Sequence, residues 1–184
     1  EFGLMCPISA TDTSAMLIER YGDEATKARL LPGMWSQDMR EILKGAQFMT
    51  EKTGGSDVGN IALEARLEDG RWRLYGEKWF CSCADGDVAL LLARPAGAAP
   101  GTAGLALFAL PRRLEDGSRN RYRIVRLKDK LGSRSMASGE IVFDGAVAYP
   151  LGKVGPAENP GLKQMMDQVN MSRLSHGVRA AGMM

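Results

Sequence analysis

Between residues 45 and 151 the sequence repeatedly alternates short apolar segments with turn residues, and this pattern restricts the possible folds more than any other feature. Residues 62–67 and 71–75 alternate apolar and polar side chains on either side of Asp69-Gly70, a strong signal for a β-hairpin. Short apolar runs flanked by Gly and Pro, typical of buried strands, follow at residues 88–93 and 105–110. Further strands, with a turn expected at Asp144-Gly145, are indicated at residues 122–127, 140–143 and 146–149. About seven or eight strands of this kind predict an antiparallel β barrel or sandwich.

Helical signals flank this β-rich segment on both sides. Residues 11–14 offer N-caps for a first helix that Gly22 ends. Residues 23–31 begin with acids and end with a base, which suits the helix dipole, and this second helix is expected to stop before Pro32. Near the other end, Asn159-Pro160 combines an N-cap residue with proline at the first helical position, and apolar residues follow at helical spacing.

The predicted fold is therefore α+β, with a β middle domain between helical flanks. We assign residues 1–44 to the end of an N-terminal helical domain, 45–155 to the β middle domain, and 156–184 to the start of a C-terminal helical domain. The last helix is too apolar to stand alone and is expected to need partner helices. Because the sequence opens without methionine and stops inside this helix, we expect a fragment or cleaved product of a longer protein.

Composition argues against several classes of protein. Apolar residues make up 45% of the chain, and no apolar run reaches the roughly 20 residues that a membrane-spanning helix needs. The net charge of +2 argues weakly against a dedicated nucleic-acid binder. Three cysteines and one histidine at no ligand spacing argue against a metal site, and the odd number of cysteines fits a reducing, cytoplasmic compartment.

A basic segment runs from residue 112 to residue 134, where nine Lys or Arg residues accompany three acids. The favoured interpretation is a solvated loop and strand face. The alternatives are contact with a phosphate of CoA or of a dinucleotide, or with nucleic acid. For His176, in the last helix, a packing or surface role is the simpler interpretation.

The first candidate for a binding site is the stretch from residue 50 to residue 57. The amides of Gly54-Gly55-Ser56 can approach an anion closely, since glycine has no side chain to hold it away. Ser56 and Thr50 each add a hydroxyl donor. For this stretch alone, a plain turn is the simpler interpretation.

The second candidate is the strand at residues 76–82. Its alternation predicts Trp79, Cys81 and Cys83 on one face, with Phe80 and Ser82 on the other. An aromatic ring beside a hydroxyl suits a flat heteroaromatic ligand. Alone, this stretch too is more simply an ordinary packed strand.

Taken together at this separation, the two stretches resemble the middle domain of the acyl-CoA dehydrogenase family. That family has a Thr-Glu-x-x-x-Gly-Ser-Asp loop followed by a strand of the pattern Gly-x-Lys-x-aromatic-x-Thr/Ser. The matching residues here are Thr50, Glu51, Gly55, Ser56, Asp57, Gly76, Lys78, Phe80 and Ser82. The sequence is most similar to the branch that includes the alkylation-response flavoproteins.

The resemblance implies that FAD is the cofactor and that the first motif and its strand hold the flavin ring. Thr50 would bind the pyrimidine edge through its hydroxyl and amide. Gln47 and Met49 would border the isoalloxazine on the same strand, and Phe80 would pack on the ring system.

The resemblance also assigns roles beyond the ring face. Gly55 and Ser56 would face the pyrophosphate, and Ser56 is a further candidate for substrate contact. Cys81 and Ser82 would place a backbone group and a hydroxyl near the O4 and N5 edge of the ring. Arg173 is a second candidate for substrate contact, with an interhelical salt bridge as the alternative.

The reaction implied is α,β-dehydrogenation of an acyl-CoA thioester, with a glutamate taking the α-proton and flavin N5 taking the hydride. In the family this glutamate lies in the C-terminal helical domain, so we assign no catalytic residue within this sequence and expect it to be inactive alone. An electron-transfer acceptor and a homotetrameric assembly of the parent enzyme are also implied. The alternatives are a flavin-bearing protein of stress response or nucleic-acid protection, and a β-rich binding module without flavin.

Overall fold

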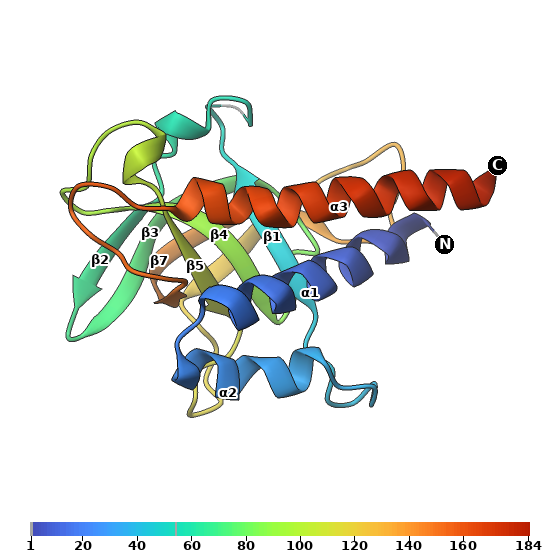
Figure 1. The fold of residues 1–184 in the computed structure, drawn as a ribbon, viewed down its shortest axis with the longest axis horizontal. Helices are drawn as coiled ribbons and strands as arrows, with labels where there is room; N and C mark the ends of the chain where they lie inside the picture. The colour runs from blue at the N-terminus through green and yellow to red at the C-terminus, as the bar shows by residue number, and fades with distance from the viewer. Residues whose placement is uncertain (1, 54) are drawn as a thin grey trace.

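The structure, a computed structural model, describes residues 2–53 and 55–184. Three α-helices accompany the sheet: α1 (Phe2–Tyr21), α2 (Glu24–Met34) and α3 (Gly161–Met183). In Figure 1, α1 and α3 run across one side of the sheet, and the two helices contact each other. Across the described residues, none of the helices combines the length and apolarity needed to cross a membrane.

Seven strands form one sheet in the order β1-β3-β2-β4-β5-β7-β6, with additional pairings of β1 with β4 and of β3 with β7. The strands are β1 (Gly45–Thr50), β2 (Glu64–Glu68), β3 (Arg71–Ser82), β4 (Val88–Pro95), β5 (Ala106–Pro111), β6 (Tyr122–Leu127) and β7 (Ser138–Pro150). Two short 3₁₀ helices, Val58–Asn60 and Thr102–Gly104, lie in the connections. The predicted α+β fold and the number of strands are confirmed.

Most strand pairings are antiparallel, as predicted, but β4 runs parallel to β1 and to β2. The β2–β3 hairpin separates β1 from β4 in sequence, so the chain re-enters the sheet beside β1 in the same direction. The parallel pairing places Phe48 opposite Leu91. Nearly every residue of β4 and β5 is buried, and α3 lies against these two strands. The apolar runs that predicted buried strands therefore form the centre of the core.

The predicted start of the first helix is wrong, because α1 begins at Phe2 rather than near residue 10. The hydroxyls of Thr11 and Thr13 do not cap a helix end. They donate to the carbonyls of Pro7 and Ser9, four residues earlier, at 2.7 Å. Threonine in a helix interior satisfies its hydroxyl in this way, so the cap signal was ambiguous. The predicted end at Gly22 is confirmed, since α1 stops at Tyr21.

Two other predicted helix boundaries are also wrong. Helix α2 continues through Pro32 to Met34 instead of stopping before the proline. At α3 the N-cap position belongs to Pro160, and no side chain caps it. Asn159 instead folds back on its own loop: its side chain accepts from the Gly155 amide at 2.8 Å and donates to the Gly155 carbonyl at 3.0 Å.

The turn predicted at Asp144-Gly145 is not a turn but an irregularity within the single long strand β7. Gly145 has a φ of 77°, which glycine adopts at little steric cost, and the pairing of β7 with β3 shifts register at this point. Gly145 therefore allows one strand to bend where the sequence suggested two.

Candidate functional site

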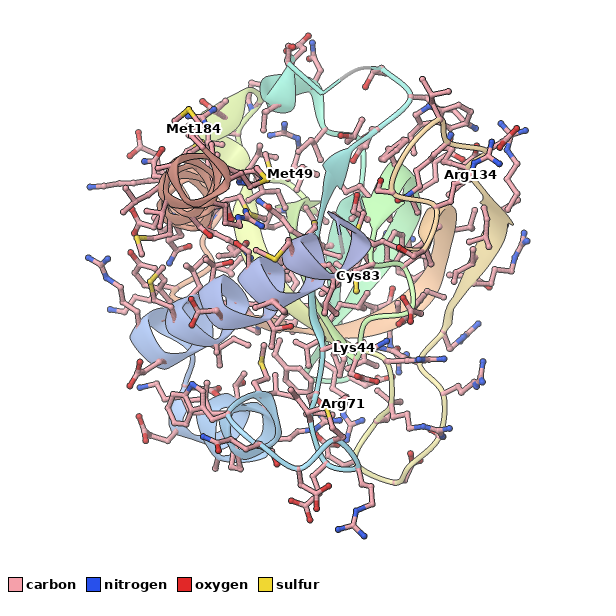
Figure 2. All side chains as sticks on the ribbon, turned by 90° about the vertical axis from the view of Figure 1, so that its right-hand side faces the viewer. Lys44, Met49, Arg71, Cys83, Arg134 and Met184 are labelled. Carbon is pink, nitrogen blue, oxygen red and sulfur yellow. The ribbon has the colours of Figure 1, made fainter. Side chains whose placement is uncertain are left out.

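A cavity of about 320 Å³ lies where the ends of β1 and β3 meet α1 and α3. Its lining comes from four elements and consists of Cys6, Ser9, Ala10, Gln47, Met49, Thr50, Phe80, Ser82, Ser172 and His176. Figure 2 shows Met49 on β1, beside α3 seen end-on and above the ribbon of α1. Five of the eight residues predicted to bind the cofactor thus border one cavity.

The antiparallel register of β1 and β3 brings the two sequence motifs together. Gln47 pairs with Ser82 and Thr50 pairs with Phe80, with an irregularity between the two pairs. The motifs lie about 30 residues apart in sequence, and the intervening β2–β3 hairpin turns the chain back on itself. Strand pairing therefore brings the residues of the two motifs, each weak evidence alone, together in one site.

The aromatic wall of the cavity is open. Phe80 is 41% exposed, although its strand β3 pairs with β1 on one edge and with β7 on the other. The hydroxyl groups of Thr50 and Ser82 border the same cavity. An uncovered ring with hydroxyls beside it fits a flat ligand that stacks on one face and hydrogen-bonds at its edge. These residues therefore fit a flavin ring.

A buried ion pair fixes the position of Thr50. The Lys78 ammonium lies 2.7 Å from the Glu51 carboxylate, and both side chains are almost completely buried. Glu51 also accepts from the amides of Ala62 and Leu63, at 2.7 and 3.2 Å. Burial lowers the pKa of Lys78, and the Glu51 carboxylate opposes that shift.

Lys78 also donates to the carbonyl of Met49 at 3.2 Å, so the residues on both sides of Thr50 are held. We call the Lys78–Glu51 pair and its backbone partners the ion-pair clamp. Both residues belong to the sequence motifs, but the motifs alone did not indicate that they meet.

The remaining predicted residues lie outside this cavity. Gly55 and Ser56 are exposed in the loop after β1, and Gly54 falls outside the described residues. Gly55 lies beside Thr50, since a Cβ at Gly55 would be 3.4 Å from the Thr50 hydroxyl oxygen. Arg173 is exposed and does not line the cavity, although its neighbour Ser172 does.

The predicted alternation along β3 breaks at Trp79. The pairing with β7 shifts register between Lys78 and Cys81, so Trp79 and Phe80 both lie near Lys128. Cys83 lies beyond the end of β3 with a φ of 55°. The irregularity explains why strict alternation failed at the site itself.

The helices supply lining residues that sequence reasoning missed. Ser9 comes from α1, and Ser172 and His176 come from α3. His176, assigned to a packing or surface role, is exposed at the cavity rim, with Nδ1 2.6 Å from the Ser172 carbonyl oxygen. These residues belong to no motif, so only the packing of the helices on the sheet brings them to the site.

Cys81 contributes no side chain to the cavity, because its thiol is fully buried. Burial raises the pKa of Cys81 to about 12 and that of Cys83 to about 11. At pH 8 the Cys81 thiol is therefore almost entirely protonated, and thiolate is the reactive form. We expect iodoacetamide to modify the half-buried Cys6 well before Cys81 or Cys83, as measured by peptide mass spectrometry. Labelling of Cys81 in the folded protein at the rate of Cys6 would contradict this burial.

The adjacent ends of β1 and β3 thus place an open aromatic ring and two hydroxyls beneath a pair of helices. The family profile of the acyl-CoA dehydrogenase middle domain matches residues 46–146. The chain belongs to the acyl-CoA dehydrogenase family, whose members are FAD-dependent oxidoreductases. The resemblance drawn from the two motifs is confirmed.

Among curated proteins, the putative acyl-CoA dehydrogenase AidB of Escherichia coli K12 is 39% identical over the whole of this chain and 34% of its own length. Acyl-CoA dehydrogenase family member 11 of Caenorhabditis elegans is 35% identical over 97% of this chain and 30% of its own length. The crystal structure of C. elegans ACDH-11 in complex with C11-CoA superimposes with a TM-score of 0.82, at 34% identity, over 92% of this chain and 29% of that one. The chain thus spans about a third of the length of these relatives.

Proposed function

We propose that this chain is the flavin-holding part of an oxidoreductase that dehydrogenates acyl-CoA thioesters. The observation that carries the proposal is the cavity in which Thr50, Phe80 and Ser82 meet. When bound, FAD supplies the hydride acceptor for α,β-dehydrogenation. We retain the three predicted domains, with residues 45–155 as the middle domain that holds the flavin.

Different residues of the cavity contact different parts of the flavin ring. The Thr50 and Ser82 hydroxyls hydrogen-bond the edge of the flavin ring, and the Phe80 ring orients it by stacking. Gln47 and Met49 border the ring on β1. Helices α1 and α3 close the cavity from the side opposite the sheet and restrict the access of water.

Other assignments concern the surroundings of the ring. The amides of Gly55 and Cys81 and the hydroxyl of Ser56 are the proposed donors to the cofactor, and Arg173 and Ser56 the proposed contacts of substrate. The base that removes the α-proton is assigned to no residue of this chain. An acyl-CoA substrate, an electron-transfer acceptor and a homotetramer are proposed from membership of the family. The free cysteines within the described part support a reducing compartment such as the cytoplasm.

We expect the Phe80→Ala substitution to weaken FAD binding at least tenfold. The substitution removes the stacking surface, and a tenfold loss corresponds to about 1.4 kcal/mol, within the range of an aromatic contact. FAD affinity is measured by titration of the full-length gene product, following the flavin absorbance and fluorescence.

The control is Trp35→Ala, which removes a large aromatic side chain that is 56% exposed and does not line the cavity. It should leave FAD affinity unchanged. A wild-type protein that stays colourless after reconstitution with FAD would overturn the proposed function. Equal losses from the two substitutions would exclude Phe80 from the flavin site.

A further inference from the structure

The cavity lined by Thr50, Phe80 and Ser82 is called the flavin cavity from here on, after its proposed function. A second cavity, of about 340 Å³, opens on a different part of the sheet and shares no lining residue with the flavin cavity. It lies between the turn after β3, the residue after β5 and the start of β6. Arg112, Arg119 and Arg123 line it together with Tyr122. We call it the arginine cavity.

The guanidinium groups of the arginine cavity are available to a ligand. Among residues 2–53 and 55–184, the side chains of Arg119 and Arg123 have neither a hydrogen-bond partner nor an ion-pair partner. Arg112 donates to the Asp85 carbonyl at 2.9 Å, and its guanidinium is 4.0 Å from the Asp87 carboxylate. One arginine is therefore fixed in place, and two have unused donors.

The local charge is positive. Asp85 lines the cavity, but its carboxylate already forms an ion pair with Lys44 at 2.6 Å. The carboxylate of Asp87 accepts from the Lys44 amide at 2.9 Å. Three guanidinium groups and one ammonium therefore face two carboxylates, which leaves an excess of positive charge that favours an anion.

Tyr122 adds a neutral donor to the same cavity. A tyrosine hydroxyl is protonated at neutral pH, and burial raises the pKa of Tyr122 further, to about 12. Within the described part of the chain this hydroxyl has no hydrogen-bond partner. The ring packs against Phe143, with ring centroids 6.0 Å apart, so the hydroxyl is held in position.

The backbone that carries these donors is fixed. Asn120, between Arg119 and Tyr122, is 5% exposed. Its amide group donates to the carbonyls of Pro111 and Val147, and its side-chain oxygen accepts from the Val147 amide, each at 2.8 Å. A buried asparagine with three such bonds anchors the start of β6 to β5 and β7. The backbone beneath the cavity is thus fixed, while the side chains of Arg119 and Arg123 extend from it without partners of their own among the described residues.

We propose that the arginine cavity binds a small phosphate-bearing molecule, with Arg119 and Arg123 as its principal phosphate ligands. Guanidinium groups bind phosphate oxygens in a bidentate manner, and a phenol adds a further donor. A concave site of this volume suits a small molecule better than a nucleic-acid duplex, which would also contact the exposed arginines along the rest of residues 112–134. The proposal does not depend on flavin binding.

The test is isothermal titration calorimetry of the full-length gene product with pyrophosphate and with inorganic phosphate, at constant ionic strength. We expect saturable binding of at least one probe, and at least a tenfold loss of affinity in R119Q/R123Q. Both side chains are exposed, so the double variant should fold, which circular dichroism checks. The matched control is R134Q, which removes an exposed arginine of the same basic segment outside the cavity.

R134Q should change affinity less than twofold. Absence of saturable binding to the wild type would overturn the proposal. An equal loss from R134Q and R119Q/R123Q would also overturn it, because the effect would then be general electrostatics. A duplex DNA that binds more tightly than pyrophosphate and depends equally on Arg134 would assign the surface to nucleic acid instead.

Discussion

Replacing Lys78 by methionine should lower the free energy of unfolding by about 3–5 kcal/mol, because the change leaves the Glu51 carboxylate buried without its partner. The ammonium and carboxylate are 2.7 Å apart, and their side chains are 0% and 5% exposed. Urea unfolding followed by circular dichroism measures the effect. The matched control is Lys52→Met, which breaks an exposed pair with Glu77 of the same 2.7 Å length. That change should cost less than about 1 kcal/mol.

The double variant K78M/E51Q tests the cause of this loss. Neutralising Glu51 removes the unpaired buried charge, and the single side-chain oxygen of glutamine can still accept from one of the two amides, of Ala62 or of Leu63, that donate to separate oxygens of Glu51. We expect the double variant to be more stable than Lys78→Met alone. A Lys78→Met protein as stable as Lys52→Met would show that the ion-pair clamp contributes little.

Replacing Gly45 by alanine should cost about 2–3 kcal/mol and lower the melting temperature by about 4–12 °C. A Cβ at Gly45 would lie 2.6 Å from the Thr11 Cα and 2.8 Å from the Ala10 carbonyl oxygen. These are backbone atoms, so α1 must move away from β1. The movement would also break the hydrogen bond from the Gly45 amide to the Thr11 hydroxyl, at 2.8 Å.

The same displacement should weaken flavin binding, because α1 forms one wall of the flavin cavity through Cys6, Ser9 and Ala10. Differential scanning fluorimetry and the FAD titration give the two readouts. Gly132→Ala is the control, since a Cβ there meets nothing within 4 Å. If the Gly45→Ala and Gly132→Ala variants melt at the same temperature, the result would contradict the close packing of α1 on β1.

The strands could be predicted from the sequence because their signals are local. The alternation on either side of Asp69-Gly70 indicated the β2–β3 hairpin, and the apolar runs indicated β4 and β5. The parallel pairing of β1 with β4 could not be predicted, because it joins segments about 40 residues apart that share no local pattern. The predicted starts of α1 and α3 were wrong because threonine and asparagine side chains had two ways to satisfy their hydrogen bonds. The predicted end of α2 was wrong because the helix continues through Pro32.

The residues of the candidate site could be predicted from the sequence where they lie on strands. Thr50 and Phe80 belong to motifs, and strand pairing brings those motifs together. Ser172 and His176 come from a helix whose contact with the sheet is tertiary, and no sequence spacing indicates it. The ion pair between Lys78 and Glu51 could not be predicted for the same reason. Both side chains are buried by tertiary packing, and a buried charge requires a partner of opposite charge.

The position of β7 has a consequence for synthesis of the protein. β7 pairs with β3, β5 and β6, yet it is the last strand to leave the ribosome. Residues 83–137 separate β3 from β7, which is 55 residues. At a translation rate of roughly 5–20 residues per second, about 3–11 seconds pass between the synthesis of β3 and that of β7, its partner along one edge. During that interval an unpaired strand edge is open to other nascent chains, so the yield of folded protein should depend on the rate of translation through this segment.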